Sequence, residues 1–227
     1  MAALSRCGYR CGAHVRANGI RQHYLRFGEG RPPLILIPGI ISTAAMWAFV
    51  AERLSQHFDV YVLDVRGRGL SESGEHLDYG LDACAADVVA FSGALRLSPY
   101  TVVGHSMGAR IAIRAARNCP DGMDRIVLID PPVTGPERRG YPIPLARMLD
   151  QVRAAKYGDV TDLLGEHSPA GWPEAQLRVR AEWLHTCDER AVEAAYRGFH
   201  EDDIHRDLRF ISTPADFILA SRGVTTP

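Results

Sequence analysis

The chain has almost no lysine, no long apolar run and no excess of charge of either sign. Of its 227 residues, 26 are basic and 27 acidic, and Lys156 is the only lysine. A formal net charge of -1 gives no basic field that would attract nucleic acid. No run approaches the roughly 20 apolar residues of a membrane helix. With 46% hydrophobic and 23% charged residues, the composition is that of a soluble globular protein, for which we expect neither a nucleic-acid partner nor a membrane span.

Paired cysteines and targeting signals are also lacking. The five cysteines include no C-x-x-C pair, so neither a disulfide framework nor a zinc site is predicted. Arg6 and Arg10 interrupt the first residues and leave no apolar core for a secretory signal. A single lysine in a polar stretch is a poor candidate for Schiff-base chemistry. We therefore expect a cytoplasmic protein with reduced thiols and no metal.

What the sequence does contain is an alternation of short apolar runs with longer helical patterns. The apolar runs predict buried strands over residues 34–37, 60–65, 101–103 and 125–129. The helical patterns predict helices over residues 44–57, 81–95 and 107–118. Asn18-Gly19, between two alternating segments, predicts an antiparallel hairpin over residues 13–27 at the edge of the sheet. This order is typical of an α/β fold with a mostly parallel sheet flanked by helices.

The pattern changes after Asp130. Five prolines fall between positions 131 and 144, and polar helical patterns follow to about residue 199. A strand pattern returns only at residues 215–220. The sequence therefore predicts a core domain formed by residues 1–131 and 211–227, and a helical cap insertion over residues 132–210.

Gly104-His105-Ser106-Met107-Gly108 matches the G-x-S-x-G pattern of a nucleophilic serine. The pattern alone is weak, but here it follows a predicted strand and precedes a predicted helix, which is the setting that the motif requires. The glycines allow a strained turn that exposes the Ser106 hydroxyl. An ordinary glycine-rich turn is the alternative. Attack on a carbonyl also needs two donors for the oxyanion, and we expect the backbone N–H groups of Met107 and of Ile40, which follows the Pro38-Gly39 turn.

Gly67-Arg68-Gly69 follows another strand and could open a dinucleotide-binding turn. That fingerprint requires a third glycine three residues later, where this chain has Glu72. We therefore expect no nucleotide cofactor, and no cofactor of any other kind.

These features resemble the α/β-hydrolases, and more narrowly the N-formylmaleamate deformylases of bacterial nicotinate degradation. The resemblance runs from about residue 18 to residue 220. The segments that carry it are residues 17–23, 36–40, 61–71, 103–110, 130–133, 180–187 and 199–201. It implies an α/β-hydrolase fold and a serine hydrolase that cleaves an N-formyl amide and releases formate from a small-molecule substrate. It also implies that Asp64 and Arg66 fix a turn beside the active site.

In that family the catalytic triad is Ser, Asp and His in chain order, and the resemblance assigns the first two roles to Ser106 and Asp130. The alternative for Asp130 is a cap on the Pro131-Pro132 turn. The family's histidine follows the last strand, but no histidine follows residues 215–220 here. We therefore expect a C-terminally truncated core without its last strand and helix, and impaired hydrolysis, because a serine without a base is a poor nucleophile. The alternative candidates for the base are three histidines of the insertion, His185, His200 and His205.

Other possibilities remain open at this stage. The chain could be a carboxylesterase or a C–C bond hydrolase, or, in a different class, a non-catalytic remnant or binding module. Arg138 and Arg139 are the candidates for binding a substrate carboxylate. The strand over residues 215–220 would be an unpaired sheet edge through which the chain could self-associate.

Overall fold

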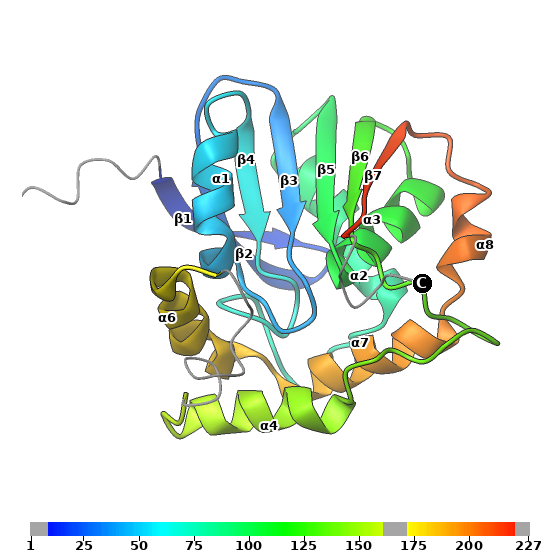
Figure 1. Cartoon of the computed structure of the whole chain (residues 1–227). Coiled ribbons are helices and arrows are strands. Elements are labelled where there is room, and N and C mark those ends of the chain that lie inside the picture. The colour runs from blue at the N-terminus through cyan, green and yellow to red at the C-terminus, as the bar shows by residue number, and fades with distance from the viewer. Residues whose placement is uncertain (1–8, 161–171, 221–227) are drawn as a thin grey trace, which may run out of the picture.

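The computed structural model describes residues 9–160 and 172–220 (Figure 1). Seven strands of this part of the chain form one sheet in the order β1-β2-β4-β3-β5-β6-β7. Their bounds are β1 (Tyr9–Ala17), β2 (Ile20–Phe27), β3 (Pro33–Ile37), β4 (Asp59–Leu63), β5 (Tyr100–His105), β6 (Met123–Ile129) and β7 (Ala215–Ile218). The pairs β1/β2 and β2/β4 are antiparallel and the other pairs are parallel. The mostly parallel sheet expected from the sequence is confirmed.

The predicted hairpin forms the edge of this sheet. Strands β1 and β2 are joined by Asn18 and Gly19, whose φ angles of 49° and 77° are both left-handed. Two consecutive residues with positive φ make the tight hairpin turn that matches the twist of the strands. The hairpin prediction is confirmed, and β1 begins earlier than the sequence pattern indicated.

The central strands bury apolar side chains on both faces. Ile35 and Ile37 of β3 belong to the core under α2 (Leu81–Ala94) and α3 (Met107–Asn118), whereas Leu34 and Leu36 face α1 (Ala48–Leu54). Successive side chains of a strand point to opposite faces, so a strand covered on both sides needs an unbroken apolar run. This is why the short apolar runs in the sequence identified the central strands.

One predicted helix is interrupted. Residues 44–57 form a 3₁₀ turn, η1 (Ala44–Trp47), followed by the short helix α1. The turn is held by Asp64, whose Oδ1 accepts from the N–H of Ala44 at 2.6 Å. Trp47, with φ -108° and ψ 2°, departs from helical geometry. A long-range hydrogen bond therefore overrides the local helical pattern.

Most helices that follow β6 lie across the carboxyl ends of the parallel strands (Figure 1). They are α4 (Leu145–Lys156), α6 (Glu174–Trp183), the 3₁₀ turn η2 (Leu184–Thr186) and α7 (Glu189–Glu201). The last helix, α8 (Ile204–Leu208), lies beside the sheet, against α3. The chain then returns to the sheet as β7, whose residues are exposed and which pairs with β6. The helical content expected between the two strands is present in the described residues. The division into core and cap domains, and self-association through β7, stay predictions.

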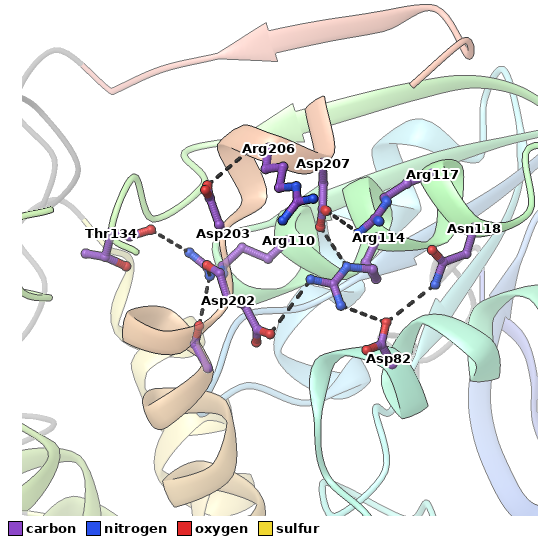
Figure 2. A network of polar contacts seen from close by, with 11 residues as sticks. Asp82, Arg110, Arg114, Arg117, Asn118, Thr134, Asp202, Asp203, Arg206 and Asp207 are labelled. Carbon is purple, nitrogen blue, oxygen red and sulfur yellow. Dashed lines mark hydrogen bonds and ion pairs between the residues drawn. The ribbon is translucent and has the colours of Figure 1, made fainter. Parts of the chain in front are cut away.

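Arginines of α3 connect the core to these later helices (Figure 2). Arg110 donates to four backbone carbonyls, among them those of Gly198 at 2.9 Å and Asp202 at 2.7 Å. Arg114 donates from Nε to Asp207 of α8 at 2.6 Å, and Arg117 binds the same carboxylate. Positions 110, 114 and 117 share one face of a helix. Because Asp207 is almost fully buried, this network fixes α8 against α3.

Among the described residues, no helix combines the length and the apolar character needed to cross a membrane.

Candidate active site

Ser106 lies at a sharp turn between the carboxyl end of β5 and the first residue of α3. Its backbone has φ 54° and ψ -115°, a conformation that a residue other than glycine rarely adopts. The N–H of Ser106 donates to the carbonyl of Ile129 at 2.9 Å, and the Ser106 carbonyl accepts from Ala109 at 3.0 Å. The strained residue is therefore held from both sides, by strand β6 and by the first turn of α3. Strain held in this way is characteristic of functional sites.

The two glycines of the G-x-S-x-G sequence are needed for close backbone contact. A Cβ atom on Gly104 would lie 2.3 Å from the carbonyl oxygen of Gly108, and one on Gly108 would lie 2.1 Å from the carbonyl oxygen of Ile37. Both distances are far below any normal contact. The turn therefore requires glycine for packing reasons, because neither residue has a positive φ. The sequence pattern predicted glycine here for its conformational freedom, whereas the structure requires it for close packing.

Asp130 lies next to Ser106 at the same edge of the sheet. It directly follows β6, in which Ile129 pairs with His105 of β5. Its backbone has a positive φ of 48°, and its N–H donates to the carbonyl of Ile218 at 2.8 Å. Its Oδ1 accepts from the N–H of Ala220 at 3.4 Å. The strand register thus brings together the serine and the carboxylate that the sequence singled out.

A cavity of about 470 Å³ opens in front of Ser106. This volume is within the range of small-molecule binding sites. Its walls are mainly apolar, and Trp47 and Trp172 are among the residues that form them, while Trp183 packs against the core instead. Ser106, the loop residues Gly39 and Ile40, and helices α4 and α6 all contribute to the lining. The cavity therefore lies between the sheet and the later helices.

The loop after β3 lies beside the serine, as the sequence predicted for an oxyanion donor. A Cβ atom on Gly39 would lie 3.6 Å from the Cβ of Ser106. The fully buried Arg68 donates from Nε to the Ile40 carbonyl at 2.7 Å, and its two other donor groups bind the carbonyls of Arg66 and Ala191. Met107 supplies the first N–H of α3, one of the helix donors without an intrahelical acceptor. Ile40 thus lines the cavity and Met107 directly follows Ser106, while Arg68 fixes the loop that holds Ile40.

Asp64 and Arg66 hold the turn beside this loop. Asp64 accepts hydrogen bonds from the backbone of Ala44 and Leu70 and forms a 2.6 Å contact with His23. Arg66 makes a two-point ion pair with the buried Asp87. The partners of both side chains belong to the fold and not to the cavity, which agrees with the structural role that the resemblance implied.

Tyr141 was not identified from the sequence and lies at the serine. It lines the same cavity as Ser106, and its ring packs 4.9 Å from that of Phe199. Burial raises the pKa of Tyr141, and the nearby Ser106 side chain offsets part of that rise. The residue belongs to a proline-rich segment with no recognisable pattern, so no local signal could have indicated this role.

His105 is the histidine that lines the cavity among the described residues. Its ring lies 5.0 Å from that of Trp47, and its Nδ1 is buried without a hydrogen-bond partner in the described part of the chain. Burial lowers the pKa of His105, and the nearby Asp130 raises it in part. The imidazole is therefore neutral near neutral pH.

The three histidines considered as replacement bases lie elsewhere. His185 lines a separate open pocket beside Lys156, His200 packs against the ring of Tyr196, and His205 contacts the carbonyl of Val133 at 3.1 Å. None of them lines the cavity at Ser106. Within the described residues, no group of three or more His, Cys, Asp or Glu side chains is arranged to hold a metal ion.

The arginines expected to bind substrate lie outside the lining of this cavity. Arg138 and Arg139 are exposed on the segment between β6 and α4, in a turn where the N–H of Arg138 donates to the carbonyl of Gly135. Neither lines the cavity. The arginines that do are Arg147 of α4 and Arg180 of α6. Residues 136–140, which include both expected arginines, are exposed, so this part of the segment before α4 lies at the surface.

Comparison with known proteins agrees with this geometry. The family model described as the alpha/beta hydrolase fold matches residues 32–180. An N-formylmaleamate deformylase of Pseudomonas putida is 56% identical over 212 residues, which are 93% of this chain and 79% of that protein. The crystal structure of an N-formylmaleamic acid deformylase from Pseudomonas putida S16 superposes with a TM-score of 0.87 at 50% identity, covering 92% of this chain and 82% of the other.

More distant structures share the fold. An enol-lactonase from Burkholderia xenovorans superposes with a TM-score of 0.73 at 21% identity, covering 95% of this chain and 84% of the other. The serine turn, the parallel sheet and the cavity at the strand ends are thus accompanied by both sequence and structural similarity. This chain belongs to the alpha/beta hydrolase fold family and is by family a hydrolase.

Proposed function

We propose that the chain cleaves N-formylmaleamate to maleamate and formate, with Ser106 as the nucleophile. The Ser106 oxygen attacks the formyl carbon, and the N–H groups of Ile40 and Met107 stabilise the oxyanion that forms. The C–N bond then breaks, and the nitrogen takes up a proton as maleamate leaves. Water cleaves the resulting formyl ester of Ser106, which releases formate and restores the hydroxyl. Asp130 is the acid that would orient a histidine base.

The observation that carries this proposal is the strained Ser106 turn opening into a cavity of about 470 Å³. The substrate comes from the similarity to the deformylases of Pseudomonas putida, which extends over more than nine tenths of the chain. The buried thiols of Cys84 and Cys187 are free, as is usual for a protein in a reducing cytoplasm, where we place the reaction. The cavity lies between a core of residues 1–131 and 211–227 and a cap of residues 132–210.

The described residues offer no evident general base for Ser106. Of the insertion histidines that the structure describes, His185, His200 and His205 all lie outside the cavity lining at Ser106. We therefore expect slow turnover that replacement of any of the three by alanine leaves unchanged. Rapid turnover that disappears in one of these alanine variants would show that the insertion supplies the base.

The test measures where the formyl group of the substrate goes. The purified chain, at a concentration equal to that of N-formylmaleamate, should release formate and carry a formyl group on the Ser106 peptide in mass spectra. The Ser106→Ala variant should do neither, whereas Ser42→Ala, which changes a serine of the same cavity, should behave like the wild type. A fluorophosphonate should label Ser106 independently of the substrate, since the oxyanion donors are backbone groups.

Product analysis separates the alternatives. Cleavage of simple esters or of C–C bonds without formate release from N-formylmaleamate would make the chain a serine hydrolase of another specificity. Absence of both fluorophosphonate labelling and product would contradict a nucleophilic Ser106 and support a binding module.

A further inference from the structure

Arg180 lies inside the cavity of Ser106 but comes from a distant part of the chain. It belongs to α6, and its Nη1 donates to the carbonyl of Ile41 at 3.2 Å, next to the loop that holds Ile40. The residue as a whole is half-buried and lines the cavity. Arg180 and Ser106 therefore border the same cavity.

The guanidinium of Arg180 is incompletely paired. Its Nε atom is buried and has no hydrogen-bond partner among the described residues. Arg68 provides a contrast in the same region, because its Nε and both terminal nitrogens each donate to a backbone carbonyl. A buried donor without a partner is costly, and a charged one more so. Folding alone does not account for such a group, because an apolar side chain of similar size would avoid the cost.

The charge of Arg180 also has no acidic counterpart in the described part of the chain. The one ionisable group that favours its charged form is the thiol of Cys187, while burial lowers the pKa of Arg180. Burial raises the pKa of Cys187 to about 11, so that the thiol is neutral near neutral pH and gives no compensating charge. An arginine side chain stays protonated in proteins. The cavity wall therefore carries a positive charge that no carboxylate of the described residues pairs with.

We propose that Arg180 binds a carboxylate of the molecule that occupies the cavity, through its incompletely paired guanidinium. A carboxylate matches the fork of donors on a guanidinium and also neutralises the charge. This inference rests on the proposed function for the identity of the substrate: in N-formylmaleamate the carboxylate and the formyl group are at opposite ends. Binding of the carboxylate at Arg180 leaves the formyl end for Ser106.

Arg147 provides a matched control. It lines the same cavity but is exposed on α4, where water solvates its charge. An ion pair at an exposed arginine contributes little to binding, whereas one at a buried and unpaired arginine also removes the cost of the unpaired donor. Of the two, Arg180 is therefore the one that discriminates a carboxylate from a neutral group.

The test measures binding and needs no catalysis. The probes are maleamate and its neutral analogue maleamide, in which an amide replaces the carboxylate, titrated calorimetrically into the full 227-residue chain. We expect the wild type to bind maleamate at least about tenfold more tightly than maleamide. Arg180→Gln should abolish this preference, Arg180→Lys should keep part of it, and Arg147→Gln should keep nearly all of it.

Thermal melting distinguishes a binding residue from a structural one. Removal of an unpaired buried charge should leave the melting temperature of Arg180→Gln unchanged or raise it, whereas loss of a structural contact would lower it. The proposal is overturned if the wild type shows no preference for maleamate, if Arg180→Gln retains the preference, or if Arg147→Gln alone abolishes it. Carboxylate binding at Arg180 without formate release from N-formylmaleamate would instead contradict the proposed function and leave this inference in place.

Discussion

Replacement of Gly108 by alanine should disrupt the serine turn and destabilise the protein. The added Cβ would lie 2.1 Å from the carbonyl oxygen of Ile37 and 2.7 Å from that of Pro38. Ile37 is fully buried in the central strand β3, and Gly108 is in the first turn of α3. The atoms in conflict include no flexible side chain, so that α3 and β3 themselves must separate by roughly 1 Å to reach normal van der Waals contact.

The magnitude follows from the cost of overpacking. Forced shifts in a well-packed core cost about 1–3 kcal/mol, and occasionally more. Because the shift here is between backbone segments, we expect Gly108→Ala to lower the free energy of unfolding by at least about 3 kcal/mol. Gly93 in α2 is a matched control, since it is exposed and a Cβ there meets nothing within 4 Å. Gly93→Ala should raise the free energy of unfolding by about 0.5–1 kcal/mol, the usual preference for alanine in a helix.

Urea denaturation of the wild type and the two variants measures both effects. Labelling of Ser106 by a fluorophosphonate provides the functional measurement, and it should slow in Gly108→Ala but not in Gly93→Ala. A Gly108→Ala protein as stable and as reactive as the wild type would refute the close approach of α3 to β3 and, with it, the packing explanation of the G-x-S-x-G glycines.

Three other measurements test the structure. Asp207→Asn should lower the free energy of unfolding by about 3–5 kcal/mol, because it breaks a buried ion pair, and Asp216→Asn, at an exposed pair, by less than about 1 kcal/mol; equal losses in urea would contradict the network of Figure 2. Burial raises the pKa of Cys187 from 9.0 to about 11, so its contribution to stability is complete below pH 9.0 and is lost as the pH rises toward 11. Cys187→Ala should therefore melt with a weaker alkaline dependence than the wild type, and an identical dependence would contradict the burial of the thiol. Tyr141→Phe should slow fluorophosphonate labelling of Ser106 about tenfold at unchanged stability, whereas unchanged labelling would deny the hydroxyl a role.

Much of the fold was predictable because the decisive signals are local. The unbroken apolar runs identified the strands at the centre of the sheet, which are covered on both faces. The predicted helix over residues 107–118 has the bounds of α3, and Asn18-Gly19 forms the turn expected of it. The predicted helix over residues 44–57 was wrong in part. The hydrogen bond of Ala44 to Asp64, which interrupts it, spans 20 residues and cannot be detected from the local pattern.

The contrast between local signals and long-range contacts also holds for the active site. The sequence by itself determined the serine turn, because its strand, glycines and helix are contiguous, and it placed Ser106, Asp130 and the Ile40 loop at one edge, because the carboxyl ends of parallel strands meet there. Only the tertiary structure decided which side chains complete the cavity. Tyr141, Arg147 and Arg180 come from the segment after β6, and their positions depend on how α4 and α6 pack across the strand ends. Arg138 and Arg139 were expected at the site as arginines at the start of the predicted insertion, but position in the chain does not determine the direction of a loop. Long-range packing sets that direction. Arg180 lies 74 residues beyond Ser106 in the chain, so only the folded structure shows its buried guanidinium beside the same cavity.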